Sequence, residues 1–277
     1  MKYNPLTYIA IIYIPFLLLG CREEKRVITP IIPGGDRVIL LEEFTGKGCS
    51  NCPKGSREIE NLLSLYSENL VVVSIHAGFF ANPDFFHIGE YDLRTDEGED
   101  LFDYLGPNSG YPAGVINRTA FNGELQLTAS AWAGFIGNEI EEDPVIEFQI
   151  TSDYDPQGRV ITVNLSGRAK TSVSGDLRAS VMILESGIID AQDDFEAGGV
   201  IEDYEHKHVL RDMLTKFDGE SFSSGLMLGE TFELEFSGAI QPDWNDAKVD
   251  IVAFISNVDS GEGTFEVLQA GQLHLVD

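Results

Sequence analysis

The chain contains 277 residues with 46 acidic and 18 basic side chains, which gives a formal net charge of −28 at pH 7. A surface this acidic repels nucleic acid and anionic lipid, so it argues against phosphate binding and against a nucleic-acid partner. The length exceeds one typical domain of about 100–200 residues, so two domains are expected.

The first 20 residues are typical of a secretory signal peptide. Lys2 precedes an apolar run over residues 7–20 that stops at Cys21. The run is short for a membrane span, which needs about 20 apolar residues, and a basic start with a small residue before the cut fits a cleaved leader. Cleavage leaves 257 residues with a net charge of −29, because Lys2 is the only charged residue of the leader.

The segment 18–21, Leu-Leu-Gly-Cys, resembles a bacterial lipobox. The resemblance implies that Cys21 becomes the lipidated first residue and anchors the chain to a membrane; an uncleaved anchor with an incidental cysteine is the alternative. The next residues, Arg-Glu-Glu-Lys at 22–25, resemble an outer-surface export signal of Gram-negative lipoproteins, although a solvated tether would look the same. We expect a lipid-anchored protein of the bacterial outer membrane, with cell-surface exposure as one arrangement.

A flexible tether is expected over residues 21–35, which contain two prolines and two glycines near their end. Assigning Cys21 to lipid leaves Cys49 and Cys52 as a lone pair. The exported compartment is one where disulfides persist.

The first predicted domain covers residues 36–142. A continuous apolar strand over 37–44, a helix with one apolar face from Pro53 to Leu70 and a second buried strand over 70–75 form a strand-helix-strand unit, which implies a parallel sheet. Helices are expected near 98–105 and over 129–142. Between them, residues 78–96 carry four phenylalanines that would form a lid, a partner surface or ordinary core.

The second predicted domain covers residues 143–277. Alternating strands are expected at 145–151, 159–166, 177–185, 231–237, 249–256 and 265–269. Several short strands with polar turns and no convincing helix favour an immunoglobulin-sized β-sandwich.

The two cysteines lie between a predicted strand and the first turn of a predicted helix. The positive end of the helix would stabilise the Cys49 thiolate, and Cys52 would lie within reach to resolve a mixed disulfide. Pro53 suits a first turn because no intrahelical bond is lost there. A structural disulfide clasp and half of a zinc site are the alternatives, and the chemistry requires no cofactor.

Residues 40–44 followed by Cys-Ser-Asn-Cys-Pro at 49–53 resemble the active-site segment of thioredoxin-fold oxidoreductases, and Tyr111-Pro112 resembles their cis-proline loop. The resemblance implies that Pro112 shapes a substrate groove, with the backbone at Tyr111 binding an extended substrate. It also implies that Glu43 exchanges a proton with Cys52, which a raised pKa would allow.

The sequence departs from the thioredoxin pattern at two points, so the redox potential of thioredoxins cannot be assigned to this cysteine pair. Gly48 stands where an aromatic residue usually precedes the first cysteine, and the dipeptide between the cysteines is Ser50-Asn51.

Over most of the mature chain, the sequence is similar to the outer-membrane-protein-28-related lipoproteins. Segments 44–46, 49–53, 74–78, 204–211 and 267–270 carry the match. The resemblance implies an α/β thioredoxin-like domain followed by an all-β, immunoglobulin-like sandwich. It implies no settled activity.

Histidines and acidic residues offer further candidates. His76 would lie near the cysteines and, as a cation, favour the thiolate, or simply pack. His206 and His208 would chelate a metal with Glu202 or Asp203, or brace the fold. The acidic stretch 190–203 would bind Ca²⁺ or be a solvated loop, and the spacing favours the loop, so no metal site is expected.

Two functions follow. The leading one is thiol-disulfide exchange on exported protein thiols, with Cys49, Cys52, Glu43 and Pro112 as the catalytic set. The competing one is a binding or assembly lipoprotein in an outer-membrane complex, with a static disulfide. An exposed, reactive pair would indicate the first, and a buried, slow pair the second.

Overall fold

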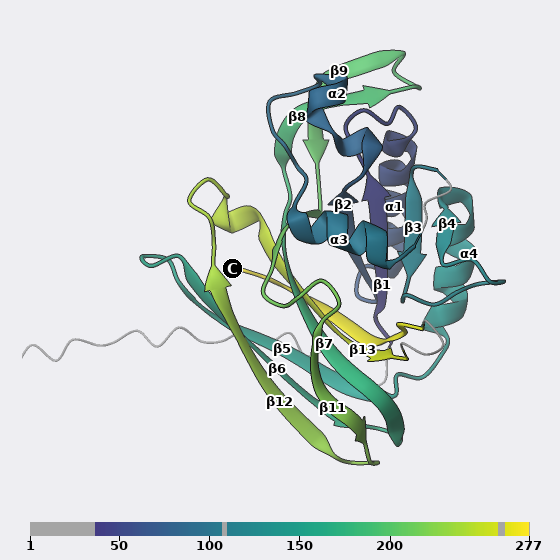
Figure 1. Cartoon of the computed structure of the whole chain (residues 1–277), viewed down its shortest axis with the longest axis vertical. Coiled ribbons are helices and arrows are strands. Elements are labelled where there is room, and N and C mark those ends of the chain that lie inside the picture. Colours follow the sequence, from purple (N-terminus) through teal and green to yellow (C-terminus); the bar gives the residue numbers. More distant parts are fainter. Residues whose placement is uncertain (1–36, 107–109, 260–263, 277) are drawn as a thin grey trace, which may run out of the picture.

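The computed structural model describes residues 37–106, 110–259 and 264–276 (Figure 1). The predicted signal peptide, the tether and Cys21 lie outside the described residues. The described part is mostly β, with fourteen strands and four α-helices.

The strand-helix-strand unit predicted around the cysteines is confirmed. Strand β1 (Ile39–Thr45), helix α1 (Cys52–Tyr66) and strand β2 (Leu70–His76) follow in order, and β1 pairs with β2 in parallel. The remaining elements of this half are η1 (Phe79–Ala81), α2 (Pro83–Phe86), α3 (Asp96–Tyr104), β3 (Ala113–Ile116), β4 (Gln126–Thr128) and α4 (Ala129–Ile140).

The second half consists almost entirely of strands. All six predicted strands are present, four more lie between them, and η2 (Asp246–Lys248) precedes β13. The strands are β5 (Ile146–Asp155), β6 (Val160–Ala169), β7 (Val173–Glu185), β8 (Ile188–Asp194), β9 (Gly199–His206), β10 (Val209–Met213), β11 (Glu220–Leu226), β12 (Thr231–Ala239), β13 (Val249–Val258) and β14 (Val267–His274).

One nine-stranded sheet joins both halves of the chain. Its order is β14-β13-β7-β10-β2-β1-β3-β4, and β11 also pairs with β7. The short strand β10 makes the connection, because it pairs in parallel with β2 on one side and antiparallel with β7 on the other. Antiparallel β5, β6 and β12 form a second sheet, and β8 and β9 form a separate hairpin.

The predicted fold class, an α/β thioredoxin-like domain followed by an immunoglobulin-like sandwich, is wrong. The sheet is mixed and mostly antiparallel, and strands from both predicted segments share it. Apolar periodicity indicated single strands correctly, but pairing between β2 and β10 depends on residues far apart in sequence. The domain boundary between residues 142 and 143 falls in the connection between α4 and β5 and stays a prediction.

Three apolar clusters hold the layers together. Helices α1 and α4 cover one face of β1 and β2, where Ile59, Leu62, Trp132 and Ile136 are buried. Helix α3 covers the opposite face through Leu101. The three-stranded sheet packs through its own apolar face on β7, β13 and β14.

Strand β7 contributes to two of these clusters because side chains alternate along a strand. Val181 and Ile183 face the three-stranded sheet, whereas Met182 and Leu184 join the cluster that contains Phe44 of β1. All four side chains are fully buried. Strand β7 is therefore covered on both faces and forms the centre of the molecule.

Candidate functional site

Cys49 and Cys52 form a disulfide at the start of α1, immediately after the loop that leaves β1. The Cys52 N–H donates to the Cys49 carbonyl at 3.1 Å, which closes the turn into the helix. Their relative exposures are 3% and 1%. The disulfide is therefore placed as predicted but covered.

Glu43 of β1 lies beneath the first turns of α1. A Cβ atom built on Gly55 would lie 2.6 Å from Glu43 Oε1 and 2.9 Å from the Pro112 ring. Gly55 follows Cys52 by three residues, so both lie on the same side of the helix. A glycine at this position lets the acid and the proline approach the helix closely.

Burial dominates the chemistry of Glu43, which is 1% exposed. Removal from water raises its pKa to about 8, against a small opposing effect of the hydrogen bond that Ser74 Oγ donates to Oε2 at 3.2 Å. Oε1 has no hydrogen-bond partner. This carboxyl is therefore mostly protonated at neutral pH.

The Tyr111-Pro112 peptide bond is cis. The close approach of the Pro112 ring to Gly55 places this loop against the cysteine-bearing helix, and the catalytic role of Pro112 stays a prediction. The Tyr111 hydroxyl donates to the Ala77 carbonyl at 2.6 Å, which ties the loop to the chain leaving β2. The substrate-binding role of Tyr111 stays a prediction.

An aromatic segment borders the disulfide on one side. The Gly48 N–H donates to the Phe80 carbonyl at 2.9 Å, and a Cβ atom at Gly48 would overlap the Phe86 ring. Phe79 and Phe85 on the same segment are 53% and 61% exposed. The segment is thus partly core and partly surface, and the glycine accommodates the ring that packs on it.

The β8–β9 hairpin covers the disulfide loop on another side. The N–H groups of Asp193 and Phe195 donate to the carbonyls of Lys47 and Ser50 at 2.9 and 2.8 Å. Gln192 Nε2 donates to the Cys49 carbonyl at 3.1 Å. These hydrogen bonds end on the carbonyls of Lys47, Cys49 and Ser50, so the hairpin is fixed to the backbone of the cysteine loop itself.

Two ion pairs reinforce this cover. Lys47 Nζ lies 2.7 Å from Asp190 Oδ2, and both side chains are buried. Arg57 Nη1 lies 2.9 Å from Asp194 Oδ2, with Arg57 at the surface. Asp190 also accepts hydrogen bonds from the N–H groups of Glu90 and Tyr91, which connects the hairpin to the segment after α2.

The ion pairs set the pKa values of the two aspartates. Burial alone raises each pKa, but hydrogen bonds from Lys47 to Asp190 and from Arg57 to Asp194, together with backbone N–H groups, outweigh it and leave both pKa values lowered. The acidic stretch was expected to be a solvated loop, which is wrong for these two residues. The sequence held no clear signal for these pairs, because Lys54 also flanks the cysteines and is exposed.

His76 and His206 meet behind this loop. Their rings are 5.4 Å apart between centroids and nearly perpendicular. Burial lowers the pKa of His76 well below its usual value and that of His206 to about 4, so both rings are neutral at pH 7. His76 therefore supplies a hydrogen-bonding group and not the predicted positive charge.

Among the described residues, no group of three or more histidine, cysteine, aspartate or glutamate side chains is arranged to hold a metal ion. His206 ends β9, and His208 follows with a left-handed backbone, φ +56°. Within the same ranges, no helix is long and apolar enough to cross a membrane.

The fold and site define a mostly β protein with a covered disulfide at the start of a helix and a buried acid below it. Residues 101–273 match the model of the family outer membrane protein Omp28, and the chain belongs to this family. The family resemblance drawn from the sequence is thereby confirmed for the family itself, and the family name suggests an outer-membrane protein. Among curated proteins, none matches.

Two of the solved structures that resemble the chain are informative about its fold. "HBP35 of Porphyromonas gingivalis" aligns with a TM-score of 0.67 and 18% identity, covering 86% of this chain and 75% of that chain. Protein AGR_C_4864 from Agrobacterium tumefaciens aligns with a TM-score of 0.52 and 11% identity, covering 86% and 94%. At these identities the likeness concerns the fold alone.

Proposed function

We propose that this Omp28 family member exchanges its Cys49–Cys52 disulfide with thiols of exported proteins in the cell envelope. The observation that carries the proposal is the buried acid below the disulfide-bearing helix. Glu43 has a pKa raised to about 8 by burial and leaves Oε1 without a partner. A static disulfide needs no such acid, and an unsatisfied buried polar group costs folding free energy.

In the exchange, a substrate thiolate attacks Cys49 Sγ, a new sulfur-sulfur bond forms and the Cys49–Cys52 bond breaks. Cys52 leaves as a thiolate and takes the proton of Glu43. A second substrate thiolate then attacks the mixed disulfide and releases Cys49. Two electrons pass from the substrate dithiol to the cysteine pair, and the same steps run backwards for reduction of a substrate disulfide.

Access is the condition that this reaction must meet. Cys49 and Cys52 are only 3% and 1% exposed, so a protein thiol cannot reach the disulfide in this arrangement. The β8–β9 hairpin and the segment that contains Phe86 pack on the loop that carries the cysteines. The hairpin is held by hydrogen bonds and ion pairs, which water can replace when it moves away. Exchange therefore requires that the turn end of the hairpin, which contacts the disulfide loop at Asp193 and Phe195, moves away from it.

The second candidate is a binding or assembly protein of the outer membrane with a static disulfide. The burial of both sulfurs favours it, because buried disulfides exchange slowly. The two candidates differ in reactivity and not in fold.

The deciding experiment is the reduction potential and exchange rate of the cysteine pair in the chain without its leader, measured by thiol labelling across a glutathione series, with Cys49→Ser as the blank. A potential of about −120 to −270 mV with exchange onto a model disulfide supports the proposal. A pair that stays oxidised below about −300 mV and reacts only after unfolding establishes the static disulfide.

Glu43→Gln tests the acid separately. A raised pKa means that the folded state holds its proton more tightly than the unfolded state, so stability from this group is full below about pH 4.5 and falls as pH rises toward 8. The fall should be on the order of 3 kcal/mol by pH 7 and absent in Glu43→Gln, measured by urea unfolding. Glu68→Gln, at an exposed position of the connection after α1, is the control.

For the membrane, we propose attachment through a lipid on Cys21. The Leu-Leu-Gly-Cys segment and the family's outer-membrane name support it. Metabolic labelling with palmitate should mark the wild-type chain and not Cys21→Ser, and equal labelling of both would contradict the anchor. Protease treatment of intact cells would show on which face of the membrane the chain lies.

A further inference from the structure

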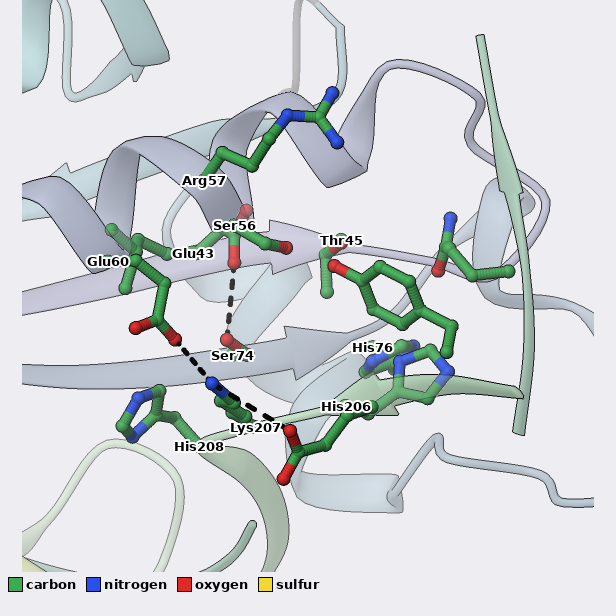
Figure 2. A pocket seen from close by; sticks show the side chains of 14 residues that line it. Glu43, Thr45, Ser56, Arg57, Glu60, Ser74, His76, His206, Lys207 and His208 are labelled. Carbon is green, nitrogen blue, oxygen red and sulfur yellow. Dashed lines mark hydrogen bonds and ion pairs between the residues drawn. The ribbon is translucent and has the colours of Figure 1, made fainter. Parts of the chain in front are cut away.

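A cavity of about 260 Å³ lies behind the disulfide loop (Figure 2). Its walls come from the β1 and β2 strands, from α1, from β8 through Gln192, and from β9 with the chain that follows it. Figure 2 shows Glu43 beside Ser74, with the rings of His76 and His206 adjacent to each other. The β8–β9 hairpin thus contacts the cysteine loop with one end and lines this cavity, which stays open to solvent, with the other.

Four polar atoms among the cavity residues have no hydrogen-bond partner within the protein. They are Glu43 Oε1, His76 Nδ1, His206 Nε2 and His208 Nδ1. The first three belong to side chains that are 1%, 4% and 4% exposed. Buried polar groups in proteins are nearly always satisfied, by protein or by ordered water, so these atoms call for an occupant of the cavity.

Charge decides what kind of occupant fits. Lys207 already pairs with Glu60 at 2.9 Å, and Arg57 pairs with Asp194 and Glu196, so the cations at the cavity are not available to an anion. The described residues offer no set of three metal ligands. The remaining partner is a neutral hydrogen-bonding molecule, and the volume holds several waters at roughly 30 Å³ each.

We propose that this cavity is a water-filled proton passage between Glu43 and solvent, and that His206 is the positioning residue that holds its water. The proposal rests on the proposed exchange function and adds the route by which the acid is recharged. Once Cys52 has taken its proton, the Glu43 carboxylate recovers one from solvent through the water chain, so one solvent proton ends on Cys52 for each disulfide opened.

His206 suits this role because its two ring nitrogens differ. Nε2 has no partner, whereas backbone groups at Asp190 and Ala191 hydrogen-bond to the ring and fix its orientation. Its ring is neutral at pH 7 because burial lowers its pKa to about 4. A neutral imidazole nitrogen can accept a hydrogen bond from water without introducing a charge into the cavity.

The charged and titratable groups around Glu43 and His206 come from every wall. The loop after β1 supplies Lys47, and β8 supplies Asp190. Strand β10 supplies Arg211, whose positive charge helps to lower the pKa of His76. The others lie on α1, β2, β9 and the chain after β9 and are Arg57, Glu60, His76, Tyr204, Glu205, Lys207 and His208.

The test measures the rate at which dithiothreitol reduces the disulfide in the folded chain from pH 6 to pH 9, in water and in deuterium oxide, for wild type, His206→Leu and His206→Gln. Below pH 8, where Cys52 depends on a delivered proton, His206→Leu should be about tenfold slower. At pH 9 the two should agree. His206→Gln, whose amide can hold a water, should recover most of the rate and of the solvent isotope effect.

The outcomes separate the two proposals. If His206→Leu merely loosens the hairpin, the reduction rate changes by the same factor at every pH. That result overturns the passage and leaves the exchange function intact. The same conclusion follows if His206→Leu and wild type have identical pH profiles and isotope effects. A wild-type disulfide that dithiothreitol does not reduce in the folded chain overturns the exchange function and the passage with it. Water-protein NOEs at the His206 ring are expected in wild type, and their absence would show a dry cavity and overturn the passage.

Discussion

Two small antiparallel sheets stand apart from the nine-stranded sheet, and they are attached in opposite ways. The β5–β6–β12 sheet buries an apolar face that includes Ile150, Val163 and Leu165. The β8–β9 hairpin is attached through ion pairs and hydrogen bonds, while Ile189 and Phe195 remain 54% and 75% exposed. Figure 1 shows them at opposite ends of the molecule.

The two kinds of attachment indicate which sheet can move. Apolar burial is lost as soon as two layers separate, whereas water replaces most of a polar contact that opens. A two-stranded hairpin is also marginal by itself and depends on its contacts. The apolar attachment therefore serves stability, and the polar attachment suits a cover that opens over the disulfide.

The largest effect should come from breaking the apolar attachment. Leu165→Ala removes a side chain that is 1% exposed and should lower the free energy of unfolding by about 2–5 kcal/mol. Val160→Ala on the same strand, where the side chain is 42% exposed, is the matched control and should cost well under half as much. Urea unfolding measures both, and equal losses would contradict the assignment of this sheet to the core.

An intermediate effect is expected from the polar attachment. Asp194→Asn weakens the pair with Arg57, which lies partly in solvent, so the stability loss should be only about 1 kcal/mol. Hairpin opening should rise accordingly, and dithiothreitol should reduce the disulfide about fivefold faster. Glu196→Gln, which removes an exposed partner of the same arginine, should leave the rate unchanged. Equal rates in all three chains would show that the hairpin does not control access.

The smallest effect should be a pH dependence of access. Because the folded-state pKa values of Asp190 and Asp194 are lowered, their ion pairs stabilise the closed hairpin above the usual aspartate pKa of 3.8 and lose that contribution as pH falls through the lowered values. A phosphine reductant that works in acid should therefore react faster as pH drops below about 3.8. The increase should be weaker in Asp194→Asn, and a flat profile in wild type would contradict the role of the aspartates.

Local patterns in the sequence predicted local structure well. The 3.6-residue apolar repeat after Pro53 forms α1, as predicted. The short apolar runs form β1, β2 and the six strands predicted for the second half. The cysteine spacing predicted a disulfide at a helix start, which is confirmed. These features depend on residues that are close together in the sequence, so composition and periodicity are enough to predict them.

Long-range pairing was the part that local patterns could not supply. Strand β10 has five residues, and nothing in its sequence indicates that Val209 pairs with Ser74 of β2. Nor does the acidic stretch reveal that Asp190 is a buried partner of Lys47, because a solvated loop has the same composition. The cover over the disulfide and the cavity behind it both follow from these unpredicted contacts.

The central position of β10 also has a consequence for how the chain matures. The chain is synthesised and exported from its N-terminus, so β2 appears before its neighbour β10. One edge of β2 stays unpaired until residues 209–213 follow, more than 130 residues further along the chain. Such non-local closure is slow and leaves an unpaired strand edge open to wrong partners. During export the cysteine-bearing half would thus depend on chaperone protection until the second half arrives, and a fragment ending near residue 142 should aggregate when expressed alone.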